Sequence, residues 1–147
     1  KIEITGSDPK ITKKAASALF ENARETLESV CLWNECNVLA ATFLKEGSKV
    51  TKLKLRSCKE DVLKDVAAHN KAPLRYLEIE PHFGIRDSTF KKLTNVCQGV
   101  EEIKIHCMKS PPEAMIEFIN SCPSLKTVRV PLKIIPGLKP SVRHIII

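Results

Sequence analysis

Aromatic residues are scarce in this chain of 147 residues, at 5% of the sequence, and they include a single Trp and a single Tyr. Hydrophobic residues of all kinds nevertheless make up 43%. The core of such a protein must be built mainly from aliphatic side chains, and this length suits one domain. We therefore expect a stack of similar aliphatic layers rather than one core arranged around large rings.

The chain also lacks the sequence patterns of membrane spans, cofactor sites and catalysis. No apolar run approaches the roughly 20 residues that cross a bilayer, and no signal peptide is visible. We find no phosphate-binding loop, no nucleophile elbow and no paired acid and histidine. The sequence therefore predicts a protein that is not an enzyme and that binds no cofactor, no metal and no membrane. Its first residue is Lys rather than Met, and we expect a part of a longer chain.

One apolar pattern recurs along the chain: an apolar residue, two free positions, an apolar residue, one free position and an apolar residue. Its six copies are Leu27-Val30-Leu32, Val50-Leu53-Leu55, Leu74-Leu77-Ile79, Val100-Ile103-Ile105, Leu125-Val128-Val130 and Val142-Ile145-Ile147. Ile2 and Ile4 are what remains of a seventh copy. The copies start 17 to 26 residues apart, which is typical of repeat proteins.

Each copy is expected to form a short strand, because apolar and polar residues alternate within it, and the segments between copies have helical spacing. In the first of these segments the expected buried face consists of Ile11, Ala15, Ala18 and Leu19. Three prolines between Pro131 and Pro140 leave no room for a helix of normal length, so a one-turn or extended link is expected. Val142–Ile147 then forms an apolar edge strand that is open to self-association.

The six cysteines follow this repeat rather than pairing with one another. Cys97 and Cys122 each lie three residues before a copy, and none of the six forms a C-x-x-C pair or stands at zinc-finger spacing from a histidine. Such cysteines are typical of small buried hydrophobic side chains in the reduced form, with disulfides or metal ligands as the alternative. Reduced thiols favour the cytoplasm or the nucleus.

Two stretches carry a resemblance to a known family. Val50-x-x-Leu53-x-Leu55-x-x-Cys58 has a cysteine three residues after a copy, and Cys122-Pro123-Ser124-Leu125-Lys126 leads into the fifth copy. In both, the chain resembles leucine-rich-repeat proteins, and in particular the cysteine-containing subtype of F-box/leucine-rich-repeat proteins. The resemblance implies one domain over residues 1–147, with about six repeats in a right-handed α/β horseshoe solenoid. Its parallel sheet would line the concave face and its helices the convex face.

The same resemblance implies protein–protein recognition by the concave face and, by extension, substrate recognition for a ubiquitin ligase. No F-box segment lies in these residues.

Within the strands, the free positions should form three rows on the concave face, with neighbours about 4.8 Å apart. The first row is Lys1, Ser29, Lys52, Tyr76, Glu102, Thr127 and His144. The middle row is Glu3, Cys31, Lys54, Glu78, Lys104, Arg129 and Ile146. The last row is Thr5, Trp33, Arg56, Glu80, His106 and Pro131.

Opposite charges alternate within these rows, although the net charge of the chain is +7. Lys54, Glu78 and Lys104 are consecutive and Arg56 stands beside Glu80, and each such pair contributes about 0.2–1 kcal/mol. A groove that follows phosphates requires a continuous positive row instead, so nucleic acid is not the expected partner. A solenoid that binds nucleic acid through basic helices and a purely architectural segment are the alternatives.

The lone Trp33 and the lone Tyr76 both fall on this face, and aromatic residues are common at the centres of protein interfaces. Trp33 can instead stack on Arg56 for local stability, and His106 can pair with Glu80 or Glu102. We expect a non-catalytic module whose concave face binds a protein partner. The predicted contact residues are Trp33, Lys52, Lys54, Arg56, Tyr76, Glu78, Glu80, Glu102, Lys104, His106 and Arg129.

Overall fold

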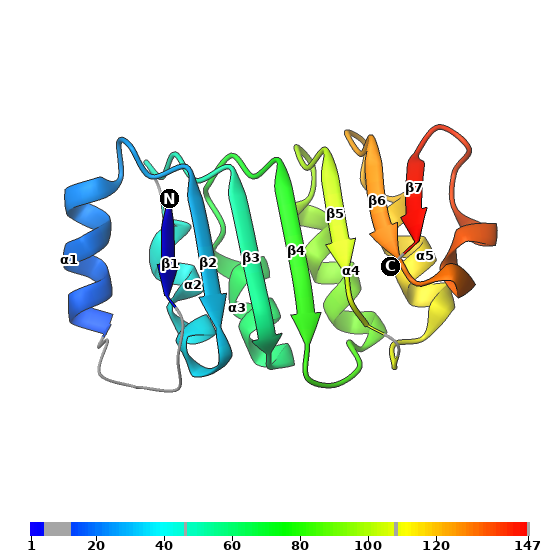
Figure 1. Ribbon diagram of the computed structural model, residues 1–147, viewed down its shortest axis with the longest axis horizontal. Helices are drawn as coiled ribbons and strands as arrows, with labels where there is room; N and C mark the ends of the chain where they lie inside the picture. The colour runs from blue at the N-terminus through cyan, green and yellow to red at the C-terminus, as the bar shows by residue number, and fades with distance from the viewer. Residues whose placement is uncertain (5–12, 46, 108, 147) are drawn as a thin grey trace.

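The computed structural model describes residues 1–4, 13–45, 47–107 and 109–146, and in these ranges seven parallel strands form one sheet in chain order (Figure 1). The strands are β1 (Ile2–Ile4), β2 (Ser29–Trp33), β3 (Lys52–Cys58), β4 (Tyr76–Pro81), β5 (Glu102–Ile105), β6 (Thr127–Val130) and β7 (Arg143–Ile146). The connecting segments contain α1 (Lys13–Ala23), α2 (Ala40–Phe43), α3 (Glu60–His69), α4 (Asp87–Val96), α5 (Pro112–Asn120) and the 3₁₀ helices η1 (Asn34–Leu39) and η2 (Leu132–Gly137). The predicted α/β class with a parallel sheet is confirmed.

The described helices cover one face of the sheet and leave the other open (Figure 1). We call the open face, which bears the side chains of the free repeat positions, the strand face. The apolar repeat positions point the other way, and Leu53, Leu55 and Leu77 have no exposed surface. In the helix layer, the rings of Phe90 and Phe118 lie 5.3 Å apart between centroids. The core therefore lies between the sheet and the helices.

The registers from β1 to β6 follow the apolar pattern. Leu53 pairs with Leu77 and Leu77 with Ile103, so that apolar positions of successive copies stand side by side. A shift by one residue would turn every side chain of a strand to the opposite face, so burial of the apolar rows holds this register.

β7 departs from the predicted register by one residue. The predicted first row placed His144 beside Thr127, whereas Arg143 is the residue paired with Thr127. The middle row likewise ends on Ile145 rather than on Ile146. The prediction for these two positions was wrong, and the correction adds the exposed cation Arg143 to the strand face.

The link before β7 explains this register. The 3₁₀ helix η2 replaces the α-helix of the other repeats, as the prolines predicted. The N–H of Val142 then donates to the Lys139 carbonyl within the link (3.1 Å), and the N–H of Arg143 donates to the Lys126 carbonyl of the preceding repeat (2.9 Å). The strand is therefore entered one residue earlier than the apolar pattern indicates. Among the described strands β7 is paired on one side only, and self-association through Val142–Ile147 stays a prediction.

The buried face of α1 also differs from the prediction. Three of the residues predicted to be buried are exposed: Ala15, Ala18 and Leu19. The fourth, Ile11, lies outside the described residues. Ala16 and Phe20 are buried instead, and the Phe20 ring packs edge-on against Phe43 of α2, with centroids 6.5 Å apart. Burial of an aromatic ring removes more apolar area from water than burial of Leu19 would, so the ring sets the rotation of the helix.

All six cysteines are buried and none is in a disulfide. Burial raises the pKa of Cys58 to about 12, so this thiol stays protonated. The cysteines therefore pack as small hydrophobic side chains, and the cellular compartment stays a prediction. Within the described ranges, no helix combines the length and the apolar character that crossing a membrane requires.

Candidate binding surface on the strand face

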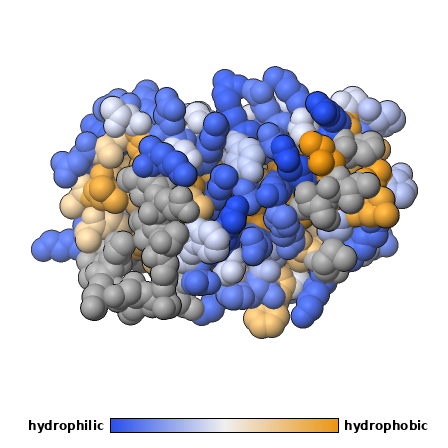
Figure 2. Space-filling view, in the orientation of Figure 1, coloured by the Kyte–Doolittle hydropathy of each residue, from blue (hydrophilic) through white to orange (hydrophobic). Residues whose placement is uncertain are grey.

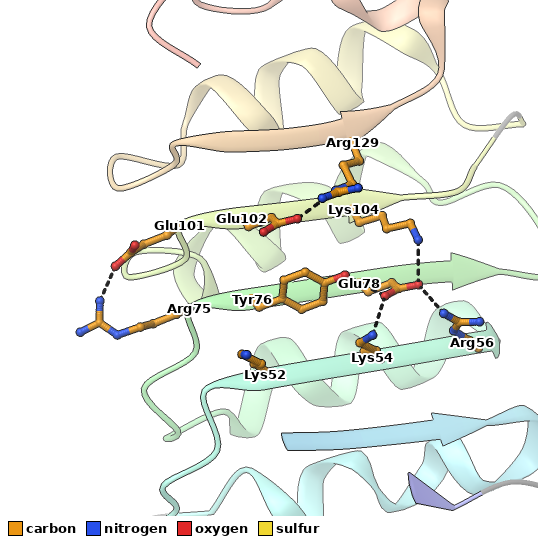
Figure 3. A pocket seen from close by; sticks show the side chains of 10 residues that line it. All are labelled: Lys52, Lys54, Arg56, Arg75, Tyr76, Glu78, Glu101, Glu102, Lys104 and Arg129. Carbon is orange, nitrogen blue, oxygen red and sulfur yellow. Dashed lines mark hydrogen bonds and ion pairs between the residues drawn. The ribbon is translucent and has the colours of Figure 1, made fainter. Parts of the chain in front are cut away.

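The middle of the strand face is polar and hollowed. Figure 2 shows mostly hydrophilic side chains over the middle of the sheet. A pocket of about 550 Å³, the central pocket, lies there between β3 and β6 (Figure 3). Its lining residues are Lys52, Lys54, Arg56, Arg75, Tyr76, Glu78, Glu101, Glu102, Lys104 and Arg129. All of the predicted contact residues except Trp33, Glu80 and His106 belong to this set.

Glu78 of β4 lies deep in the central pocket, and its carboxylate holds four neighbouring side chains (Figure 3). Its Oε1 accepts a hydrogen bond from Arg56 Nη2 at 3.0 Å and lies 3.3 Å from Lys104 Nζ. Its Oε2 accepts from the Tyr76 hydroxyl at 2.8 Å and lies 3.5 Å from Lys54 Nζ. The predicted plus–minus–plus order across β3, β4 and β5 is confirmed, and one carboxylate serves three cations.

The Glu78 carboxylate stays ionised although it is buried. Burial raises its pKa, but the Tyr76 hydroxyl and the cations of Lys104, Arg56 and Lys54 lower it by more, so the pKa lies below its usual 4.5. Burial and the hydrogen bond to Glu78 raise the pKa of Tyr76. The phenol therefore stays protonated and acts as a donor to the carboxylate.

The charges of this cluster are sorted by depth. The Glu78 side chain is 1% exposed, whereas those of Lys54, Arg56 and Lys104 are 35%, 30% and 22% exposed. In the sequence these charges alternate along a row, but in the structure the negative charge lies beneath the positive ones. Glu78 is thus too deep for the predicted role of a partner contact, and it positions the cations instead.

A second set of ion pairs borders the central pocket. Arg129 Nε donates to Glu102 Oε1 at 3.0 Å. Glu101 pairs with Arg75 and, at 2.7 Å, with Lys126. Arg75, Glu101 and Lys126 are not among the predicted contact residues. They occupy the other free position between the first two apolar residues of each copy, and that position is the signal by which they can be found.

Trp33 lies at the edge of this region and is stacked with Arg56, whose guanidinium carbon is 4.9 Å from the ring centroid. This is the local stacking that the sequence allowed for Trp33. The expected ion pair of Arg56 with Glu80 is not among the described contacts, because the guanidinium reaches diagonally to Glu78 although Arg56 and Glu80 are partners in the register. Trp33 Nε1 and Arg56 Nε are buried without a hydrogen-bond partner among the described residues.

The three remaining predicted contacts differ in surroundings. Lys52 is exposed, and the described residues provide no ion pair for it. Glu80 and His106 are partly buried beyond the central pocket. Burial lowers the pKa of His106 and the charge of Lys104 adds to this, while Glu80 acts in the opposite direction. The imidazole is therefore neutral at pH 7, and its predicted pairing with a glutamate is not among the described contacts.

Among the described residues, no group of three His, Cys, Asp or Glu side chains is arranged to hold a metal ion. Comparison of the chain with protein-family models, with curated proteins and with solved structures found no match. What bears on the function is therefore the geometry of the strand face itself.

Proposed function

We propose that this chain is a leucine-rich-repeat solenoid segment whose strand face binds a protein partner without catalysing a reaction. The recurring apolar pattern, the strand order and the one-sided layer of helices support the solenoid architecture. Parallel sheets are usually covered on both faces, so a face over which none of the described helices lies is available to another molecule. Recruitment of substrates to a ubiquitin ligase rests on the family resemblance alone.

The central pocket is the observation that carries the proposal. Its side chains come from four neighbouring strands and are held across the strands by ion pairs. Side chains that are already held in place lose less conformational entropy when a partner binds. Arg and Tyr, which are common among the residues that dominate interface energies, both contribute to the lining.

The test compares the proteins captured from a cell lysate by the wild type and by two folded double variants, with quantitative mass spectrometry. Lys52→Glu with Arg129→Glu reverses two charges on the strand face. Lys14→Glu with Lys92→Glu is the matched control, because it reverses two exposed charges on α1 and α4. We expect a set of proteins that the wild type and the control retain and that the strand-face variant loses.

Each candidate partner is then purified, and its dissociation constant is measured with the wild type and both variants. We expect at least a tenfold weakening for the strand-face variant and no change for the control. Equal binding by all three proteins, or equal loss in both variants, would show that the strand face is not the binding surface.

A further inference from the structure

The chemistry that the strand face presents to a partner follows from which of its charges can be reached. Six cations and three carboxylates line the central pocket. The carboxylate of Glu78 is buried, and the Glu102 carboxylate is paired with Arg129. Glu101 and Glu102 are 30% and 32% exposed, which is comparable with Lys54 and Lys104 at 35% and 22%, but each of these two carboxylates is engaged by cations. Lys52 is exposed and has no ion pair among the described residues. Cations outnumber carboxylates two to one in the lining, so the net charge at the centre is positive.

Donors also predominate in the hydrogen-bonding capacity of the centre. An ammonium group has three N–H donors, and Lys54 and Lys104 each direct one toward Glu78. Lys52 has no ion pair among the described residues, and Arg129 uses only its Nε for Glu102. The surface thus offers charged donors, while the strongest acceptor beneath them is already saturated.

We propose that the central pocket binds an acidic segment of the partner protein, with two or more Asp or Glu carboxylates placed against Lys52, Lys54, Lys104 and Arg129. This inference rests on the proposed function, because it assumes that the strand face is the binding surface. Three strand spacings separate β3 from β6, or about 14 Å. Side chains on one face of an extended peptide recur about every 6.8 Å. An extended segment that crosses the strands therefore places two or three carboxylates over the cations.

Single-stranded nucleic acid fits this surface less well than an acidic peptide does. Bases bind such surfaces by stacking on free aromatic faces. Here Arg56 lies over the Trp33 ring at 4.9 Å, and Lys54 lies over the Tyr76 ring at 5.5 Å. A continuous phosphate chain would also pass close to the carboxylate of Glu102, which is partly exposed at the border of the pocket. A short run of separate carboxylates avoids both difficulties.

Fluorescence anisotropy with labelled probes tests this inference on the whole chain. The probes are a peptide of repeating Glu-Ser, the matched peptide of repeating Gln-Ser, and an oligouridylate of similar length. We expect the Glu peptide to bind, the Gln peptide to bind at least tenfold more weakly, and the affinity of the Glu peptide to fall as salt is added.

Variants then locate the binding site. Lys52→Gln removes a cation without an ion pair among the described residues, so the fold should be unaffected, and Lys104→Gln removes a second cation. Each should weaken binding of the Glu peptide by about two- to fivefold. Lys92→Gln, which removes an exposed cation from α4, is the matched control and should leave the affinity unchanged.

The inference is overturned if the Glu peptide fails to bind, if it binds no better than the Gln peptide, or if Lys52→Gln and Lys104→Gln bind it as the wild type does. Tighter binding of the oligouridylate would assign the surface to nucleic acid instead. Should the strand-face variant still lose captured proteins while the Glu peptide does not bind, only the acidic chemistry is wrong. If the strand-face variant captures the same proteins as the wild type, the proposed function is wrong as well.

Discussion

Glu78→Gln is expected to destabilise the protein although it changes little in shape. The substitution removes the negative charge that lies beneath Lys54, Arg56 and Lys104. The amide oxygen of Gln can still accept the hydrogen bond from the Tyr76 hydroxyl. The experiment therefore isolates the contribution of one buried charge to a cluster drawn from three strands.

The magnitude follows from the geometry of the three contacts. The hydrogen bond from Arg56 at 3.0 Å has normal length, and a hydrogen bond to a charged group contributes about 1.5–3 kcal/mol. The two lysine contacts, at 3.3 and 3.5 Å, are longer, and partly exposed ion pairs contribute about 0.2–1 kcal/mol each. Hydration of the released cations offsets part of the loss. We expect the free energy of unfolding to fall by about 2–3 kcal/mol.

Urea unfolding, followed by circular dichroism and by the fluorescence of the lone Trp33, measures this change. Glu80→Gln on the same strand is the matched control, because the described residues form no ion pair with Glu80. Its free energy of unfolding should stay within about 0.5 kcal/mol of the wild type. If Glu78→Gln is as stable as Glu80→Gln, the cations are not held by Glu78, and the depth ordering of charges contributes nothing to stability.

Three further predictions concern pH, backbone packing and thiol reactivity. Folding lowers the pKa of Glu78 below its usual value of 4.5, so the ionised carboxylate contributes its full stabilisation above pH 4.5 and loses it as the pH falls through the lower pKa of the folded state. The difference in urea midpoint between the wild type and Glu78→Gln should therefore be smaller at about pH 3.5 than at pH 7. In thermal unfolding, Gly84→Ala should cost about 1–3 kcal/mol, because its Cβ would lie 2.7 Å from the Lys109 carbonyl oxygen. Gly99→Ala should not, because its Cβ would meet the Leu74 carbonyl oxygen at an ordinary 3.5 Å. The six buried thiols should resist a thiol reagent in native protein and all react in urea, and rapid native labelling of more than one of them would contradict the burial described.

The repeat predicted most of the fold because strand pairing follows the apolar rows. Each copy buries its apolar residues on one face, and so the partners of Leu53 and Leu77 could be predicted without coordinates. The prediction failed at β7, where the hydrogen bond of Val142 within the preceding link moved the entry of the strand by one residue. It also failed on α1, where the packing of the Phe20 ring against Phe43 decided which face is buried.

In the candidate site, too, some features could be predicted from the sequence and others could not. The alternation of Lys54, Glu78 and Lys104 was predictable, because it depends only on which residues are neighbours in a row. The diagonal reach of Arg56 to Glu78 instead of Glu80 was not, because a long side chain chooses among acceptors on the neighbouring strand. Arg75 and Glu101 were left out of the prediction, since only one of the two free positions between apolar residues was assigned to the surface.

For the strands from β1 to β6, the sequence by itself determined which residues share a face, because strand alternation and repeat spacing depend on residues close together in the chain. Only the tertiary structure decided how deep each charge lies. Glu78 is buried beneath cations of β3 and β5, and its neighbours there are 22 or more residues away in the chain. Depth depends on what packs around a side chain from all sides, and for this reason an alternating row of charges in the sequence became a positive surface over a buried carboxylate.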